Sequence, residues 1–268
     1  MSFKKTLLAL TLCFLFAGKS SAQVWELGLQ AGGAGYMGDL NPTKPLKISG
    51  LAVGAFVKAN FDPHWALSFN YNTGKIKADD AKSSYEQFRQ RNLSFHTQLH
   101  ELSLLVDFNF FDYFSGGGYS SFSPYLYTGV GAVIFNPKAN YQGTEYKLSQ
   151  YFTEGQTESY KTAALSIPYG AGVKYNFKTN WTVLANIGYR NAYTDYLDDV
   201  SGTYLDPANL STDPNTRPIQ EALSDRSVEV LGRKIGDKGV QRGDFRKRDT
   251  YMFVGIGITY TFVSQKCF

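Results

Sequence analysis

Six ionisable residues stand inside segments that otherwise alternate apolar with small or polar side chains. They are three acids and three bases, namely Glu26, Lys58, Glu101, Asp107, Lys174 and Arg190. Paired carboxylates could perform acid–base chemistry, and a charged row could line a narrow ion path. Because the two signs balance, and because a buried charge is costly unless it is paired, we expect these residues to form a salt-bridged network that fills an interior.

A second group of acids follows one of those segments, in a motif formed by Thr194, Asp195, Tyr196, Asp198 and Asp199. Clustered carboxylates at the base of a loop can bind a divalent cation. Alternatively, Asp195 and Asp198 could pair with nearby bases, either Arg190 or the basic stretch 226–248. We expect pairing, and therefore no metal site.

No catalytic constellation is found in the sequence. His96 and His100 stand four apart, a spacing that suits a metal only on a helix, and His100 begins a predicted strand. No Gly-x-Ser-x-Gly elbow, phosphate-binding loop or CxxC motif occurs, and Arg242-Gly243-Asp244 is too short to predict cell adhesion. We therefore expect no enzyme, no catalytic residue, no cofactor and no nucleic-acid partner.

The segments that must position these residues have a period of two. In 251–262, every second residue from Met252 to Phe262 is apolar, while the alternate row ends in Gly255, Gly257, Thr259 and Thr261. A period of two indicates a β-strand. Soluble strands average about 5–6 residues, whereas a tilted strand that crosses a bilayer needs about 9–11. The length, the apolar row and the small or polar row together predict a strand of a membrane barrel.

Seven further segments fit the same template. They are Val24–Gly35, Ile48–Phe61, Trp65–Ile76, Leu99–Phe110, Pro124–Phe135, Ser166–Phe177 and Trp181–Tyr193. The predicted fold is all-β, an eight-stranded antiparallel transmembrane β-barrel of the outer-membrane type with long external loops. A soluble antiparallel barrel or sandwich would explain the alternation but not the strand length.

The amino terminus favours export. Residues 1–22 combine a basic start, a short apolar core and the small residues Ser20-Ser21-Ala22, which predicts a signal peptide. We expect the barrel to occupy 23–262 and a periplasmic tail to occupy 263–268. Removal of the three lysines in 1–22 lowers the net charge from +4 to +1, so the overall charge indicates no particular partner.

Link lengths predict the orientation of the barrel. Short links at 62–64 and 178–180 and a medium link at 111–123 alternate with long ones at about 36–47, 77–98, 136–165 and 194–250. Outer-membrane barrels have short periplasmic turns and long external loops, so both termini should be periplasmic in this multi-pass protein. The predicted periplasmic aromatic girdle is Phe61, Trp65, Phe110, Phe177, Trp181 and Phe262. The predicted outer girdle is Tyr36, Tyr71, Phe135, Tyr189, Tyr193 and Tyr251.

Two of these links are candidate contact surfaces. The medium link carries Phe111, Tyr113, Phe114 and Tyr119, more apolar surface than a turn needs, and it is the candidate periplasmic partner contact; the alternative is lipid anchoring. The basic stretch 226–248 suits phosphate groups, which on an outer leaflet means lipopolysaccharide or an acidic partner. The alternative there is a solvated loop.

Three motifs carry a resemblance to a known family. They are Tyr36-Met-Gly-Asp-Leu-Asn41, Lys174–Trp181 together with Ile187-Gly-Tyr-Arg190, and Tyr193–Ser201. With the eight-strand layout, these resemble the PorG-like outer-membrane barrels of the Bacteroidota. The resemblance implies a non-enzymatic component of the type IX secretion and gliding apparatus, in contact with a periplasmic ring made of a lipoprotein and its soluble partner. The alternative is a stand-alone small porin-like or structural outer-membrane barrel.

Overall fold

The computed structural model describes residues 24–178, 180–244 and 246–262. Eight long strands form its body: β1 Val24–Met37, β2 Ile48–Asn60, β3 Trp65–Asp79, β4 Ser94–Asn109, β5 Phe122–Ile134, β8 Ala163–Lys178, β9 Trp181–Ala192 and β10 Thr250–Phe262. Each is antiparallel to its neighbours in the order β3-β2-β1-β10-β9-β8-β5-β4, and the β3–β4 pairing closes the ring. The predicted eight-stranded antiparallel barrel is confirmed.

The connections carry the remaining elements. A hairpin of β6 Lys138–Tyr141 and β7 Thr144–Lys147 extends from β4. The helices are η1 Asp80–Lys82, α2 Glu86–Arg91, η2 Phe114–Gly116, η3 Leu148–Gln150, η4 Pro207–Asn209, α3 Arg217–Ser224 and α4 Val228–Leu231. Among the described residues, no helix is long and apolar enough to cross a membrane. The predicted signal peptide and tail lie outside the described residues.

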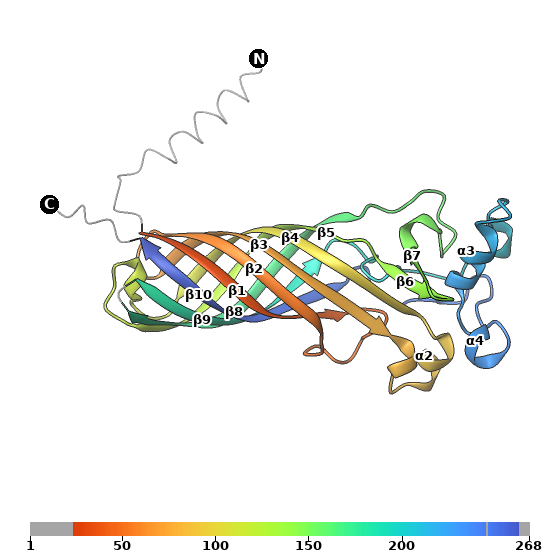
Figure 1. Cartoon of the computed structure of the whole chain (residues 1–268), viewed down its shortest axis with the longest axis horizontal. Coiled ribbons are helices and arrows are strands. Elements are labelled where there is room, and N and C mark those ends of the chain that lie inside the picture. The colour runs from red at the N-terminus through yellow and green to blue at the C-terminus, as the bar shows by residue number, and fades with distance from the viewer. Residues whose placement is uncertain (1–23, 179, 245, 263–268) are drawn as a thin grey trace, which may run out of the picture.

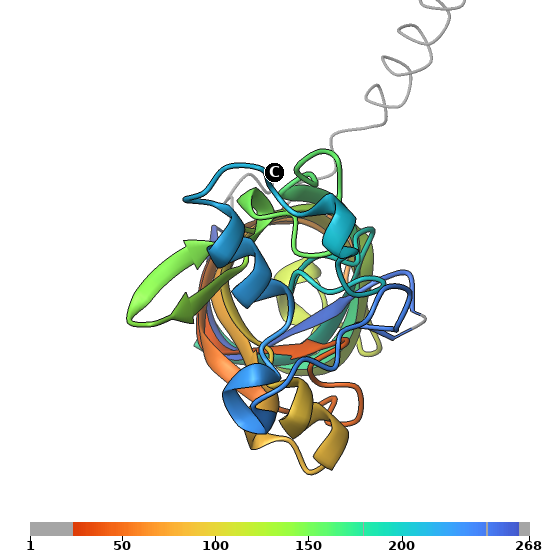
Figure 2. The same ribbon diagram turned by 90° about the vertical axis from the view of Figure 1, so that its right-hand side faces the viewer.

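The barrel has two unlike ends (Figure 1). The turn end holds the links 61–64 and 110–121 and Asn180, together with the start of β1 and the end of β10, where Trp25 pairs with Phe262. The loop end holds the links 38–47, 80–93 and 135–162, and the described parts of a fourth, 193–244 and 246–249. Figure 2 looks at the loop end and shows parts of these links lying over the mouth, while the β6–β7 hairpin stands to one side.

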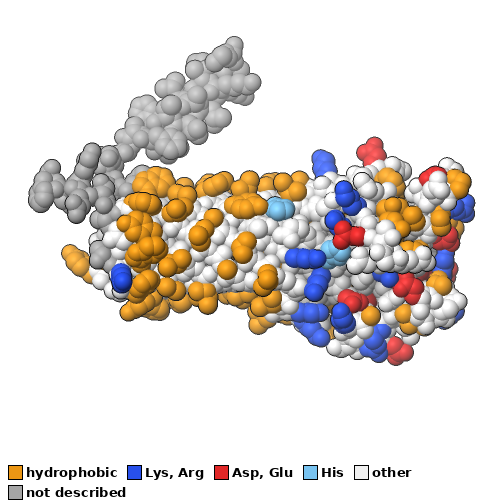
Figure 3. All heavy atoms as spheres, in the orientation of Figure 1, with side chains coloured by type: hydrophobic (Ala, Val, Ile, Leu, Met, Phe, Trp, Pro, Cys, Tyr) orange, Lys and Arg blue, Asp and Glu red, His pale blue; other side chains and the backbone are white. Residues whose placement is uncertain are grey.

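The outward side chains next to the turn end are apolar on all eight long strands, and Figure 3 shows them as a band on one face of the barrel. The side chains that form it point outward and are exposed, among them Leu27, Leu29, Val53, Val57, Phe69, Leu104, Val106, Leu126, Val130, Val173, Val183, Ile256 and Ile258. A continuous band of this kind would be unstable in water, but it is what the hydrocarbon core of a bilayer requires. The barrel is therefore a membrane-spanning one.

The strands continue past this band, and the distribution of apolar residues inverts as they do. On β4, the outward residue Leu102 is apolar and the inward residue Asp107 is charged, whereas nearer the loop end the outward residue Gln98 is polar and the inward residue Leu99 is fully buried. The inward apolar side chains of the loop-end half form one core with the links above them, which includes Ile76, Phe95, Leu99, Val133, Leu197 and Leu223. We call this core and the links around it the cap.

This inversion corrects one predicted girdle. The six aromatic residues predicted at the turn end are exposed there, as expected. Of the six predicted at the outer edge, Tyr36, Phe135 and Tyr251 instead point inward and are buried in the cap core. The prediction was wrong for these three because the strands extend beyond the bilayer, where an inward aromatic side chain packs against apolar neighbours. Tyr71 and Tyr193 are exposed.

Candidate functional site: closed lumen and cap base

The lumen next to the turn end is filled by a charged cluster. Lys58 from β2 and Lys174 from β8 both reach one carboxylate oxygen of Asp107 on β4, at 2.5 and 3.1 Å. Lys174 also donates to the side chain of Asn109 at 2.8 Å, and its ammonium lies 4.1 Å from the ring centroid of Tyr125. Every strand contributes alternate residues to the interior, which is why three distant strands supply one cluster.

A second charged layer lies nearer the loop end. Arg190 on β9 pairs with Glu101 on β4 at 3.2 Å. The same carboxylate oxygen accepts a hydrogen bond of 2.6 Å from the hydroxyl of Tyr251. Asn72 donates to Glu101 at 3.3 Å and accepts from Gln30 at 2.6 Å. This layer forms a hydrogen-bonded floor beneath the apolar core of the cap.

All six residues of the predicted lumen network are therefore inside the barrel, and each is at least nine-tenths buried. Five of them form the ion pairs described above, and Glu26 instead accepts a hydrogen bond from Asn60 at 2.8 Å. The cavity between the two layers, lined by Phe56, Asn70 and Arg190 among others, has a volume of about 30 Å³. A cavity of that volume has room for ordered water but not for a larger solute.

The turn end is closed by the link between β4 and β5. Tyr113 is fully buried, and its hydroxyl lies 2.7 Å from that of Thr182 inside the barrel. Ser115 likewise contacts the hydroxyl of Thr261 at 3.1 Å. The prediction of Tyr113 as a partner contact was therefore wrong, because a polar hydroxyl on a large ring fits the polar lumen and draws the link inward. We call this inserted segment, 113–115, the plug.

The other residues of the predicted contact are less buried than Tyr113. Phe114 is half-buried, whereas Phe111 and Tyr119 are 49% and 95% exposed. Gly117 has a φ of 91°, a left-handed conformation that favours glycine, and it turns the chain between the plug and Tyr119. The link thus has one side that fills the barrel and another that is presented at the turn end.

Two buried arginines hold the links of the cap together. Arg91 pairs with Asp80 through two nitrogens at 2.7 and 3.0 Å. It also donates to the backbone oxygens of Asp39 and Arg242 at 3.0 and 2.6 Å. One side chain therefore connects the first, second and fourth long links. Its bidentate geometry suits guanidinium rather than ammonium.

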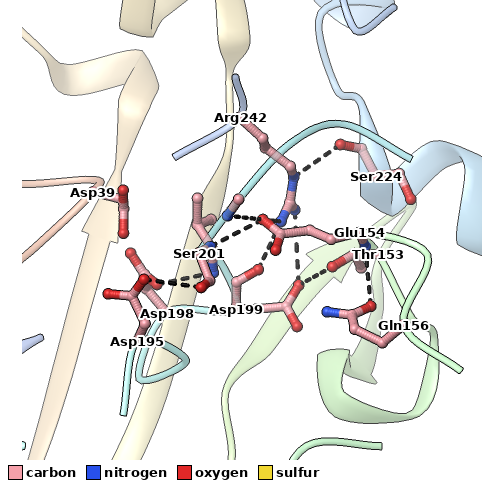
Figure 4. Close-up of polar contacts among 12 residues, drawn as sticks. Asp39, Thr153, Glu154, Gln156, Asp195, Asp198, Asp199, Ser201, Ser224 and Arg242 are labelled. Carbon is pink, nitrogen blue, oxygen red and sulfur yellow. Dashed lines mark hydrogen bonds and ion pairs between the residues drawn. The ribbon is translucent and has the colours of Figure 1, made fainter. Parts of the chain in front are cut away.

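Arg242 connects the third and fourth long links (Figure 4). It lies 3.2 Å from Glu154 and 3.7 Å from Asp199, and it donates to the backbone oxygens of Ser224 and Asp199. Because Arg242 is 3% exposed, the Arg242-Gly243-Asp244 triplet is unavailable for adhesion. Other bases of 226–248 are also paired with acids, as in Arg226–Glu229, Lys234–Glu221 and Lys238–Asp206.

Acids gather where the cap meets β1, β9 and β10. Asp39 follows β1, Asp195 follows β9 and Asp249 precedes β10, and one oxygen from each lies within 4.8 Å of the others. Burial, followed by neighbouring carboxylates, raises the pKa of Asp39 to about 7 and that of Asp195 to about 6. The pKa of Asp249 is raised in the same way. Oxygen ligands of this kind suit a hard divalent cation, and in the described residues no lysine or arginine forms an ion pair with these three.

The predicted loop-base motif supplies one of these acids and anchors the rest of the cap. Asp195 accepts from Ser201 at 2.8 Å, and Asp198 accepts from the hydroxyl of Tyr36. Asp199 accepts from Thr153 at 2.6 Å and from Tyr160 at 2.7 Å, and Tyr160 stacks on Tyr196 with centroids 4.4 Å apart. The backbone oxygen of Thr194 accepts from Asp249. The predicted pairing of Asp195 and Asp198 is wrong, because among the described residues neither forms an ion pair with Arg190, which belongs to the lumen, or with the basic stretch. It is Asp199 that lies near a base of that stretch, 3.7 Å from Arg242.

Asp39 and Asp249 were not predicted for this site. The order of the strands in the barrel could have predicted them, because β1 and β9 both pair with β10. Acids that directly follow or precede these three strands at the same end must lie close together. Asp39 lies in 36–41 and Asp195 in 193–201, so two of the three motifs behind the family resemblance meet at this site.

The comparisons with known proteins give one family. A family model described as "Domain of unknown function (DUF6089)" matches residues 4–211. A search of curated proteins found no match.

Solved structures similar to this chain include three bacterial proteins. Ail of Yersinia pestis is 10% identical, with 90% of this chain and 100% of that chain covered and a TM-score of 0.43. A major outer membrane protein of Thermus thermophilus is 14% identical, with 90% and 100% covered and a TM-score of 0.42. The outer membrane protein OprG of Pseudomonas aeruginosa is 11% identical, with 91% and 97% covered and a TM-score of 0.39. At these scores, the description of the fold rests on the strand pairing of the chain itself.

Proposed function

The chain belongs to the DUF6089 family, and we propose that it is a non-enzymatic outer-membrane component of the type IX secretion and gliding apparatus. In this proposal the turn end, with both termini, faces the periplasm and contacts the ring lipoprotein and its soluble partner. The cap then faces the exterior. The resemblance of three motifs to the PorG-like barrels supports this assignment.

The observation that carries the proposal is the closed lumen. Two charged layers and the plug fill the space where a porin has a channel. A barrel that passes no solute acts through its two ends and its outer wall. This favours a structural role in an assembly over transport of small molecules.

The turn end offers the surface that a periplasmic partner would bind. Phe111 and Tyr119 are exposed aromatic side chains on a link whose other side is fixed inside the barrel. Aromatic residues on a rigid support are typical anchors of protein interfaces. The plug thus presents these two residues with little loss of conformational entropy on binding.

The test is a pull-down of the tagged protein from its native outer membrane in mild detergent, with mass spectrometry of the ring lipoprotein and its partner. The variant Phe111→Ala/Tyr119→Ala should lower their recovery about tenfold or more, as loss of interface anchors does. Tyr85→Ala is the matched control, because Tyr85 is a 46% exposed tyrosine at the opposite end. A wild-type barrel recovered without either ring protein would refute the proposal and favour a stand-alone structural barrel.

A further inference from the structure

The second half of the first long link, 42–47, does not stand above the barrel but lies against its outer wall. The hydroxyl of Tyr189, which points outward from β9, donates to the backbone oxygen of Pro45 at 3.3 Å. Gly35 makes the close approach possible, since a Cβ there would lie 2.7 Å from the backbone oxygen of Lys47. Met252 is on the outward side of β10 and yet is 2% exposed, because this link covers it.

Below the link, the outer wall is hollowed. A groove of about 830 Å³ crosses the outer side of β1, β10, β9 and β8 and reaches Ile48 and Leu51 of β2. Small residues such as Ala31, Gly255 and Ala185 line its middle. The groove lies within the apolar band, so its occupant in a bilayer is hydrocarbon.

Above the groove, a second cavity of about 650 Å³ is lined by lysines. It lies between the first link, β3 and the β6–β7 hairpin, and it includes Lys47, Lys75, Lys77 and Lys82. Ile48 lines both cavities, so the apolar groove and the basic cavity adjoin. Figure 3 shows basic side chains gathered at the edge of the apolar band nearest the cap.

The acidic side chains beside this cavity already pair with basic side chains of their own. Asp79 pairs with Lys82 at 3.1 Å, and Glu145 contacts both His96 and Lys138 at 2.7 Å. Within the described ranges, Lys47, Lys75 and Lys77 form no ion pair, and all three are exposed. Lys75 and Lys77 project from a paired strand, so their position is fixed by the barrel.

We propose that this composite surface binds a multiply phosphorylated, multiply acylated lipid of the outer leaflet, of the lipid A type found in lipopolysaccharide. Its phosphates would lie on Lys47, Lys75 and Lys77, and an acyl chain would lie in the groove. Lysine is a common phosphate ligand, and its stem can extend along an apolar wall toward the membrane surface. The inference depends on the proposed outward orientation of the cap, but not on any protein partner.

The test uses the purified full barrel in nanodiscs of zwitterionic phospholipid, titrated with fluorescent lipid A. Each lysine near a membrane surface contributes about 1 kcal/mol to anion binding, so Lys75→Gln/Lys77→Gln should weaken binding about 30-fold. The charge-matched control is Lys161→Gln/Lys178→Gln, on exposed lysines elsewhere, and it should change binding less than twofold. Equal binding by wild type and the Lys75/Lys77 variant would overturn the proposal.

A second pair of measurements tests whether the ligand is a lipid rather than a free anion. Ala31→Phe fills the groove from an exposed, outward position and should weaken binding of lipid A several-fold more than binding of its deacylated head group. Inorganic phosphate at millimolar concentration should compete poorly. If deacylated head group binds as tightly as lipid A, the site takes free anions and the lipid assignment is wrong. Because no ring protein is present, these outcomes are independent of the pull-down.

Discussion

The two halves of the barrel use the same eight strands in opposite ways. In the half next to the turn end, apolar side chains point outward and charges point inward, as around Leu104 and Asp107. In the half next to the cap, lysines such as Lys75 point outward and apolar side chains such as Ile76 point inward. The first half is built for a bilayer and the second for water. The change occurs within single strands, so the solvent around each residue, rather than the strand as a unit, sets its type.

The largest expected loss of folding stability follows the removal of one member of a buried ion pair in the lumen. Arg190→Met leaves Glu101 buried without its cation, and removing one member of a buried pair costs about 3–5 kcal/mol. The double variant Glu101→Gln/Arg190→Met should recover most of that loss. Urea unfolding in lipid vesicles measures both free energies. A double variant as unstable as the single one would mean that the pair does not act as a unit.

A smaller loss of stability is expected from a charge placed on the outward side of β4, and its size should differ between the two halves of the strand. Leu104→Arg places a charge in the apolar band and should cost about 2–4 kcal/mol, whereas Gln98→Arg lies beyond the band and should cost about 0–1 kcal/mol. Both positions point outward from β4, so the pair is matched for strand and direction. The same unfolding assay applies. Equal costs would place the membrane boundary elsewhere and contradict the two-zone description.

The third effect concerns pH and is confined to the cap. The folded-state pKa values of Asp39 and Asp195 are raised to about 7 and about 6, above the usual value of about 3.9 in an unfolded chain. The folded cap therefore holds more protons than the unfolded chain between about pH 4 and pH 7. Its stability should fall as the pH rises through this window.

Limited proteolysis of the cap measures this dependence, and cleavage should be faster at pH 8 than at pH 5. The variant Asp39→Asn/Asp195→Asn removes both titrations and should flatten the difference. Melting of the apolar-band half should change little over the same range. A cap that becomes more resistant as the pH rises would contradict the role assigned to these acids.

The period of two in the sequence predicted all eight strands, and it placed all six ionisable residues of the lumen network, among them Glu26 and Lys58, inside the barrel. It could not predict the cap core, because the period tells which side of a strand a residue occupies, but not whether water, lipid or protein lies there. Tyr36 and Tyr251 were misplaced for that reason. The plug was missed because an aromatic residue in a link suggests an exposed surface, whereas the hydroxyl of Tyr113 finds its partner in the lumen. Asp39 and Asp249 required strand order, which a single motif does not contain.

The measurement that tests the closed lumen most directly is the conductance of the purified barrel in a planar bilayer, with and without the plug. The wild-type protein should show no steady open channel. Tyr113→Ala should still show none, because the layers at Asp107 and Glu101 remain. A steady conductance of nanosiemens size in the wild type would contradict the closed barrel, and with it the structural role proposed here.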